Sequence, residues 1–268
     1  MKELNFKLDK EKCVKCGLCV SDCSSRVIKF DEEGYPMITS NNCFGCQHCF
    51  AICPQGAISV FGKNPENSAS NRHSVNSDDL MNLIENRRSC RQYKQENIDK
   101  EKLEKLKNML NWVPTGCNFK DLHFSIIEDI NVMNSIRNDL YTDLSKLVKF
   151  IPTNKKIRKY KNAILSKEDF VFRNAPHAII VSANKNAPCK KIDPIIALSY
   201  FELYAQSLGL GTLWCGLGYW TIPFSKNVMK RLEIPKTHKL SYVMLFGNPA
   251  IDYKRGIQPE YYEMTSVK

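Results

Sequence analysis

Eight cysteines in the first part of the chain fall into two runs of the same spacing, C-x2-C-x2-C-x3-C. The runs repeat at an offset of 30 residues, and Ile28 and Ile58 match at that offset as well. Spacings of two residues let three thiolates converge on one iron–sulfur cubane, while the fourth cysteine points toward a second one. The eight residues are Cys13, Cys16, Cys19, Cys23, Cys43, Cys46, Cys49 and Cys53.

This doublet resembles the bacterial two-cluster ferredoxins, which implies two [4Fe–4S] clusters with four thiolates each. One cluster would use Cys13, Cys16, Cys19 and Cys53, and the other Cys43, Cys46, Cys49 and Cys23. These ferredoxins usually have proline after the fourth cysteine of each run. Pro54 fits and Ser24 does not, which affects local rigidity more than ligation. Zinc binding and purely structural clusters are the alternatives, although a zinc site needs only four ligands.

The composition is that of a globular protein. Hydrophobic residues make up 43% of the 268, and no run approaches the eighteen or so apolar residues of a membrane helix. The start of the chain is too charged for a signal peptide, so we expect a cytoplasmic protein without membrane association. In that compartment twelve cysteines indicate metal or redox chemistry rather than disulfides.

The net charge of +11 is unevenly distributed along the chain. Residues 1–62 carry seven Lys/Arg and seven Asp/Glu, whereas residues 63–268 carry 32 and 21. No helix-turn-helix, zinc-finger or RNA-binding signature accompanies this basic surplus, so we do not expect nucleic-acid binding. Two bound clusters would make the first segment acidic, opposite in charge to the remainder.

A polar stretch divides the chain. Residues 63–79 contain four Asn and four Ser and almost no apolar side chains, which is typical of a linker. We therefore predict a ferredoxin-like domain over 1–62, a linker over 63–79 and a second domain over 80–268.

The second domain has signals for both helices and strands. Ser77–Asp79 can cap a helix through Ile84, and a second amphipathic helix through Leu103 and Val113 ends at Pro114. Further apolar runs predict strands and one long, mostly buried helix. The strands are 122–128, 177–183, 212–216 and 240–246, and the helix is 194–208.

A basic segment, Arg87-Arg88-Ser89-Cys90-Arg91-Gln92-Tyr93, follows the first of these helices. Guanidinium forks and a hydroxyl are suitable donors to a phosphate. The segment is similar to the opening Arg-Arg-Ser-x-Arg-x-Phe/Tyr of the nitroreductase family of flavin enzymes. The resemblance implies an FMN phosphate at Arg87, Arg88 and Ser89, and Arg91 near N1 and O2 of the ring, where positive charge stabilises reduced flavin. An exposed arginine cluster at a helix end is the alternative.

Two more segments follow in the order of that family. Pro114-Thr115-Gly116-Cys117-Asn118 is similar to its Pro-Ser-x-x-Asn loop, which reaches the flavin of the partner subunit; Lys120-Asp121-Leu122 departs from the Gln-Pro-Trp of many members. Gly209–Gly216 follows a helix and enters a strand, the reverse of the Rossmann order. In the family the backbone at the end of this stretch, here Cys215 and Gly216, hydrogen-bonds flavin N5.

The fourth segment is Phe246-Gly247-Asn248-Pro249, followed by Lys254 and Arg255. It resembles the strand end and basic pair that close the family's phosphate site. Plain loops, glycines that permit tight packing and a solvated basic pair are the alternatives for these segments. Together they imply an α+β protein: a small two-cluster ferredoxin-like domain fused to a mixed-sheet, nitroreductase-like FMN domain that forms a homodimer.

Residues 146–173 hold nine Lys/Arg and two acids, and are interpreted as a flavin lid, a docking face for an acidic donor, or a solvated surface. No serine or cysteine triad and no pair of catalytic carboxylates is evident. We therefore expect an oxidoreductase in which electrons from a low-potential donor, such as reduced ferredoxin or another redox protein, pass through the clusters to FMN. Hydride transfer from N5 would then reduce a small organic acceptor, nitroaromatic or otherwise conjugated. The alternatives are NAD(P)H oxidation with export of electrons through the clusters, and a redox sensor or electron store without a substrate.

Overall fold

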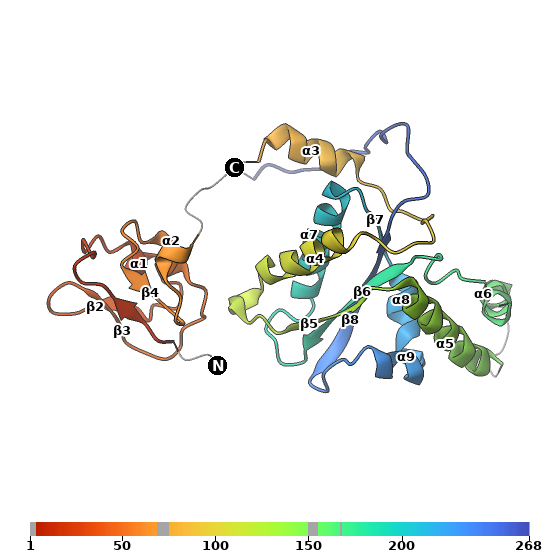
Figure 1. The fold of residues 1–268 in the computed structure, drawn as a ribbon, viewed down its shortest axis with the longest axis horizontal. Helices are drawn as coiled ribbons and strands as arrows, with labels where there is room; N and C mark the ends of the chain where they lie inside the picture. Colours follow the sequence, from red (N-terminus) through yellow and green to blue (C-terminus); the bar gives the residue numbers. More distant parts are fainter. Residues whose placement is uncertain (1–3, 69–74, 150–154, 167, 268) are drawn as a thin grey trace. The chain divides into compact units, whose positions relative to one another are not determined.

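The computed structural model describes residues 4–68, 75–149, 155–166 and 168–267, and it separates into two units. The first unit comprises Met1–Ser74 with Cys117–Phe119, and the second comprises Val75–Gly116 and Lys120–Lys268. Figure 1 shows the elements of each unit. No helix among the described residues is long and apolar enough to cross a membrane.

The first unit repeats one small motif. Its strands form two antiparallel pairs, β1 with β4 and β2 with β3, and each cysteine run carries one short helix. The elements are β1 (Lys7–Leu8), α1 (Leu18–Ser21), β2 (Ile28–Phe30), β3 (Pro36–Ile38), α2 (His48–Ile52) and β4 (Ile58–Ser59).

The backbone of this unit follows the 30-residue sequence repeat. Ile28 and Ile58, which match in the sequence, are both buried at the starts of β2 and β4. Left-handed backbone conformations, which reverse the chain locally, recur at the same offset. The matched pairs are Lys15 with Gly45, Gly17 with Gln47, and Arg26 with Gly56.

The stretch predicted as a linker is described only in part, since residues 69–74 of it lie outside the described residues. Pro65–Asn67 form a short 3-10 helix, η1. Helix α3 (Ser77–Asn86) begins inside the stretch and is capped by Asn76, whose side chain accepts a hydrogen bond from the N–H of Asp78 at 2.8 Å. The cap therefore lies one residue before the predicted Ser77–Asp79.

A four-stranded sheet in the order β5-β6-β8-β7 forms the centre of the second unit. All neighbouring strands are antiparallel, and parallel pairing among the described residues is limited to the bridge between Ser89 and Thr212. The strand predictions are confirmed, with ends shifted by one or two residues. The strands are β5 (Leu122–Ile127), β6 (His177–Asn184), β7 (Gly211–Trp214) and β8 (His238–Gly247).

Helices cover both faces of this sheet (Figure 1). The predicted helix containing Leu103 is confirmed, and its last turn, η2, ends before Pro114. The predicted helix over 194–208 is α7. The helical elements after α3 are α4 (Lys100–Met109), η2 (Leu110–Trp112), η3 (Gly116–Asn118), α5 (Ile130–Val148), α6 (Lys155–Leu165), α7 (Asp193–Ser207), α8 (Gly216–Thr221), η4 (Ile222–Phe224) and α9 (Lys226–Arg231).

The central strands bury both of their faces. On β6, Ala178 and Ile180 pack into a core with α5 and α9, whereas Ile179 and Val181 pack into a second core with α4 and α7. Successive strand residues point to opposite faces, so a strand between two helical layers needs a continuous apolar run. This requirement explains why β6 and β8 were visible in the sequence.

Candidate redox-cofactor sites

Two cavities in the first unit are each lined by four cysteines. Each takes three cysteines from one run and the fourth from the other. The first is lined by Cys13, Cys16, Cys19 and Cys53, and the second by Cys23, Cys43, Cys46 and Cys49.

The surroundings of these thiols bear on whether they can ionise, since the thiolate is the metal ligand. Burial raises the pKa of Cys49 to about 11 and also raises that of Cys19. Burial likewise opposes ionisation of Cys23, but hydrogen bonding from Ser25 and backbone N–H groups lowers its pKa overall. The N–H of Ala57 donates to Sγ of Cys53 at 3.2 Å. The most buried thiols would therefore need the positive charge of bound iron to ionise.

Among the described residues, no group of three or more His, Cys, Asp or Glu side chains is arranged to hold a metal ion. The eight cysteines line the walls of the two cavities. This arrangement fits a polynuclear cluster, whose iron and sulfide atoms occupy the space between the thiolates.

In the second unit, the predicted phosphate segment lies along strand β7. The N–H of Cys90 donates to the carbonyl of Thr212 at 2.8 Å, and Ser89 forms a bridge with the same residue. Gly211 permits this approach, because a Cβ there would lie 2.6 Å from Sγ of Cys90. Further along, Tyr93 forms a bridge with Pro249, just beyond β8. The structure thus brings the first, third and fourth predicted segments together at one sheet edge.

Arg87 has a partner that the sequence did not reveal. Its Nη1 lies 3.1 Å from Oε1 of Glu202 on α7, a residue only 8% exposed. The same carboxylate accepts from Nε1 of Trp214 at 3.0 Å and from Oγ1 of Thr212 at 3.4 Å. An acid within the mostly apolar run 194–208 was the available signal, because buried carboxylates require a partner.

The other predicted cations are less constrained. Arg88 donates from Nη1 to the carbonyl of Arg87 at 3.2 Å, and Lys254 pairs with Asp252 at 2.5 Å on the surface. Arg91 and Arg255 are exposed and have no carboxylate partner among the described residues. Arg88, Arg91 and Arg255 thus keep their charge available for an anion.

The two predicted N5-facing positions differ in what they offer. The N–H of Cys215 already donates to the carbonyl of Val243 at 2.9 Å. Gly216 is the first residue of α8, and no hydrogen bond among the described residues uses its N–H. The first N–H groups of a helix have no intrahelical acceptor. Of the two positions, Gly216 is therefore the one whose backbone N–H can donate to a ligand.

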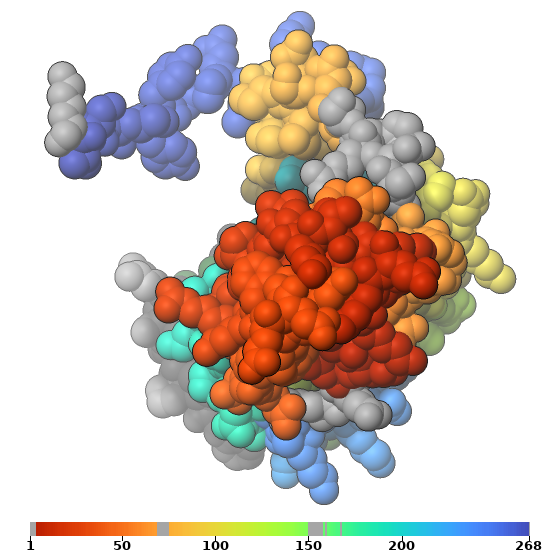
Figure 2. Space-filling view, turned by 90° about the vertical axis from the view of Figure 1, so that its left-hand side faces the viewer, coloured from red at the N-terminus to blue at the C-terminus, as the bar shows by residue number. Residues whose placement is uncertain are grey.

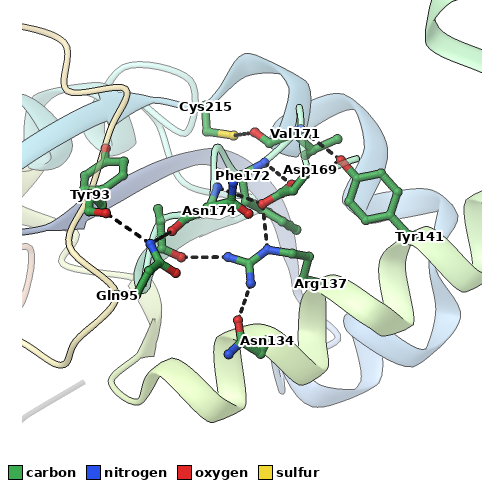
Figure 3. Close-up of polar contacts among 11 residues, drawn as sticks. Tyr93, Gln95, Asn134, Arg137, Tyr141, Asp169, Val171, Phe172, Asn174 and Cys215 are labelled. Atoms are coloured by element: carbon green, nitrogen blue, oxygen red, sulfur yellow. Dashed lines mark hydrogen bonds and ion pairs between the residues drawn. The ribbon is translucent and has the colours of Figure 1, made fainter. Parts of the chain in front are cut away.

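A buried ion pair fixes the loop that contacts Cys215 (Figure 3). Nε of Arg137 on α5 lies 2.6 Å from Oδ2 of Asp169, and Oδ1 of Asp169 accepts from the N–H of Phe172. The carbonyl of Val171, in the same loop, accepts from Sγ of Cys215 at 3.2 Å. Burial raises the pKa of the Cys215 thiol to about 12, so it is a neutral donor in this contact.

The predicted partner-reaching loop lies at the beginning of α7. The N–H of Gly116 donates to Oδ1 of Asp193 at 2.9 Å, and Thr115 accepts from the N–H of Lys120. Asn118 belongs to the Cys117–Phe119 stretch grouped with the first unit. Asp193 and Glu202 are nine residues apart, about 14 Å along the helix axis. Thr115 and Gly116 are therefore held well away from Arg87 of the same chain.

Comparison with known proteins matches both parts of the chain. Residues 84–248 match the nitroreductase family, and residues 7–60 match the 4Fe-4S dicluster domain. An iodotyrosine deiodinase of Thermotoga neapolitana is 24% identical over 175 residues, covering 63% of this chain and 88% of that protein. The pyruvate synthase subunit PorD of Methanocaldococcus jannaschii is 45% identical over 51 residues, which are 19% of this chain and 59% of that protein.

Among solved structures, a nitroreductase with bound FMN from Desulfitobacterium hafniense superposes with a TM-score of 0.58. The two chains are 21% identical, and the match covers 73% of this chain and all of the other. This similarity shows that the second unit has the nitroreductase fold.

Proposed function

The chain belongs to the nitroreductase family and carries a 4Fe-4S dicluster domain at residues 7–60, and on this premise we propose a specific route for its electrons. A low-potential donor reduces two [4Fe–4S] clusters in the first unit, and FMN in the second unit passes the electrons to a small organic acceptor. The observation that carries this proposal is the pair of four-cysteine cavities on the same chain as a nitroreductase-family domain.

The lining of the cavities supports the proposed cluster ligands. One cluster is held by Cys13, Cys16, Cys19 and Cys53 and the other by Cys23, Cys43, Cys46 and Cys49. Thiol ligation requires a reducing compartment, for which we propose the cytoplasm.

FMN would supply the chemistry that joins one-electron donors to two-electron acceptors. Arg88, Ser89, Lys254 and Arg255 are proposed to bind its phosphate, with Arg87 anchored beside them by Glu202. Arg91 would place positive charge near N1, and the N–H of Gly216 would donate to N5. Replacing Arg88 or Arg255 by Ala should weaken FMN binding by about tenfold or more, measured by fluorescence titration. Arg91→Ala should chiefly lower the flavin midpoint potential.

A homodimer completes the proposed site. Apolar side chains are exposed on α7, α8 and η4, among them Tyr200 (49%), Trp220 (68%) and Phe224 (64%). The C-terminal residues 256–267 extend away from the body of the second unit beside α3, as Figure 2 shows, and Tyr261 and Tyr262 have no cover there. Large exposed apolar surface of this kind is typical of subunit interfaces. Across such an interface the Pro114–Asn118 loop would contact the partner's flavin.

The decisive experiment compares donors under anaerobic conditions. Stopped-flow reduction of the holoprotein by reduced ferredoxin should be fast, and reduction by NAD(P)H should be slow. Replacing Cys16 and Cys46 by Ser should abolish ferredoxin-driven reduction of an organic acceptor, while flavin reduced with dithionite still passes electrons to it. Cys189→Ser is the matched control, because Cys189 lines neither cavity and belongs to none of the proposed flavin segments. Full NAD(P)H-driven turnover in the double variant would reverse the proposed direction.

A further inference from the structure

A basic cavity lies in the second unit where β6 ends and β8 begins. It has a volume of about 480 Å³ and is open to solvent. Four lysines and two tyrosines line it, and none of its lining residues is acidic. These six residues are Lys185, Lys190, Lys191, Lys239, Tyr219 and Tyr242.

The lysine charges in this cavity are not neutralised by the protein. Lys185 donates from Nζ to the carbonyl of Lys236 at 3.0 Å, and Lys190 donates to the carbonyl of Lys185 at 2.5 Å. Neither acceptor carries a formal charge. Lys191 and Lys239 are exposed and form no ion pair with a carboxylate among the described residues. Clustered ammonium groups repel one another, so an anion bound among them would be stabilised.

Nearby carboxylates are already engaged elsewhere. Asp193, which follows the loop that bears Lys190 and Lys191, is buried and accepts from the N–H of Gly116. Asp121 accepts from Nδ2 of Asn184 at 2.6 Å and lies 3.0 Å from Nε2 of His238.

The cavity also offers a flat aromatic wall. The rings of Tyr219 and Tyr242 stack with centroids 5.4 Å apart and planes 13° apart, and Trp214 packs edge-on against Tyr242. Tyr242 lies close to the proposed flavin site. Its Oη is 3.4 Å from the position that a Cβ on Gly216 would occupy, and Gly216 is the residue that we assign to flavin N5. A ring seated against Tyr242 would therefore lie near Gly216.

We propose that this cavity binds an aromatic or conjugated anion, and that the acceptor of the enzyme is such an anion, typified by an aromatic carboxylate. The inference rests on the proposed function and adds the charge of the substrate to it. Lys191 and Lys239 would bind the acidic group, and Tyr219 and Tyr242 would contact the ring.

Binding is tested first, on oxidised holoprotein with no donor present. Calorimetry measures the binding of two probes, 4-nitrobenzoate and its neutral analogue 4-nitrobenzamide. We expect the carboxylate to bind more tightly at low ionic strength, and this preference to shrink as salt is added. In the double variant Lys191→Gln with Lys239→Gln, affinity for the carboxylate should fall by about fivefold, given the modest strength of exposed charge pairs. Affinity for the amide should not change.

The second measurement is reoxidation of prereduced protein by each acceptor in the stopped flow. The double variant should need a higher concentration of 4-nitrobenzoate to reach half of an unchanged limiting rate. Lys226→Gln with Lys230→Gln removes the same charge from α9, outside the cavity, and should behave as wild type.

Each other result overturns the inference. Equal loss of affinity for carboxylate and amide would exclude charge recognition, and no loss for either would exclude the cavity. If the Lys191→Gln, Lys239→Gln variant lost bound FMN, the lysines would belong to the flavin site. If its reduction by NAD(P)H or ferredoxin were weakened while its reaction with acceptors was unchanged, the lysines would bind the electron donor. If wild-type protein reduced neither compound, the proposed function would fail, while calorimetry on oxidised protein would still decide the cavity.

Discussion

The guanidinium of Arg87 lies 3.1 Å from the carboxylate of Glu202, which joins the predicted phosphate segment to the middle of α7. Because Glu202 also accepts from Trp214 on β7, one buried acid connects the helix, the edge strand and the basic segment. The orientation of Arg87 is thus set before any ligand binds. Such prior positioning lowers the entropy cost of binding an anion.

Glu202→Ala should destabilise the protein by about 2–3 kcal/mol, because it leaves the buried hydroxyl of Thr212 and the partly buried Nε1–H of Trp214 without this acceptor. Chemical unfolding followed by tryptophan fluorescence measures this change. Glu202→Gln keeps one oxygen acceptor and should lose less. If Glu202→Ala were as stable as wild type, the hydrogen bonds of Glu202 would not contribute to the stability of the protein.

Exchange of single cysteines should reveal which thiols share a cluster. Anaerobically prepared protein should contain about eight iron atoms per chain, as two [4Fe–4S] clusters require. Cys53→Ser should remove the same electron paramagnetic resonance signal as Cys16→Ser, and Cys23→Ser the same signal as Cys46→Ser. Pairing of Cys53 with Cys46 would show that each run holds its own cluster.

Asp169→Ala should lower stability by about 3–5 kcal/mol, the usual cost of leaving one member of a buried ion pair uncompensated. The side chains of Arg137 and Asp169 are only 13% and 3% exposed. Glu101→Ala, which breaks the exposed pair with Lys105, is the control and should cost less than about 0.5 kcal/mol. Equal losses of stability in Asp169→Ala and Glu101→Ala would show that the Arg137–Asp169 pair does not behave as a buried ion pair.

The strongest sequence signals came from residues whose neighbours in the chain are also their neighbours in space. Continuous apolar runs located the strands, and the cysteine spacing located three of the four thiols that line each cavity. Helix α5 was missed although Met133, Ile136 and Leu140 are spaced as on one helix face, because its many polar residues masked that pattern. Helices α8 and α9 have six residues each, too few to show a period.

Contacts between distant segments had no such signal. Arg87 and Glu202 are 115 residues apart, and neither spacing nor composition links them. The basic cavity likewise combines residues from the loop before α7 with residues of α8 and β8. Only the folded chain brings these residues together.

The stability of the second unit should fall as the pH is lowered below neutrality. Burial lowers the pKa of His177 below its ordinary value of about 6.5, and its ring stays neutral between the N–H of Ile98 and the carbonyl of Ile127. The unfolded chain therefore takes up a proton at higher pH than the folded chain does. The contribution of His177 is complete above about 6.5 and is lost as the pH falls toward the lowered folded value.

Unfolding at a series of pH values from 7.5 to 5 would measure this slope. His177→Gln should be less stable at neutral pH and should show a shallower fall. If the stability of His177→Gln fell with pH as steeply as that of wild type, the pH dependence would come from a group other than His177.

A protein that begins at Val75 should still fold and bind FMN, because it keeps the Asn76 cap of α3 and both cores of the second unit. It should lose reduction by ferredoxin while retaining the flavin spectrum. An insoluble or flavin-free product would show that the proposed domain boundary is wrong.

The exchange of the fourth cysteine between the two runs has a consequence for how the first unit is held together. Its buried apolar core is small, with Cys19, Ile58 and Val60 at the centre. Cys53 lies 34 residues after Cys19, and Cys43 lies 20 after Cys23, so each bound cluster would tie together distant points of the chain. Because the folded unit would bind the clusters and the unfolded chain would not, the free energy of cluster binding would add to the stability of this small unit. Iron would then be a structural requirement of this unit as well as its electron carrier, and its removal would unfold the unit.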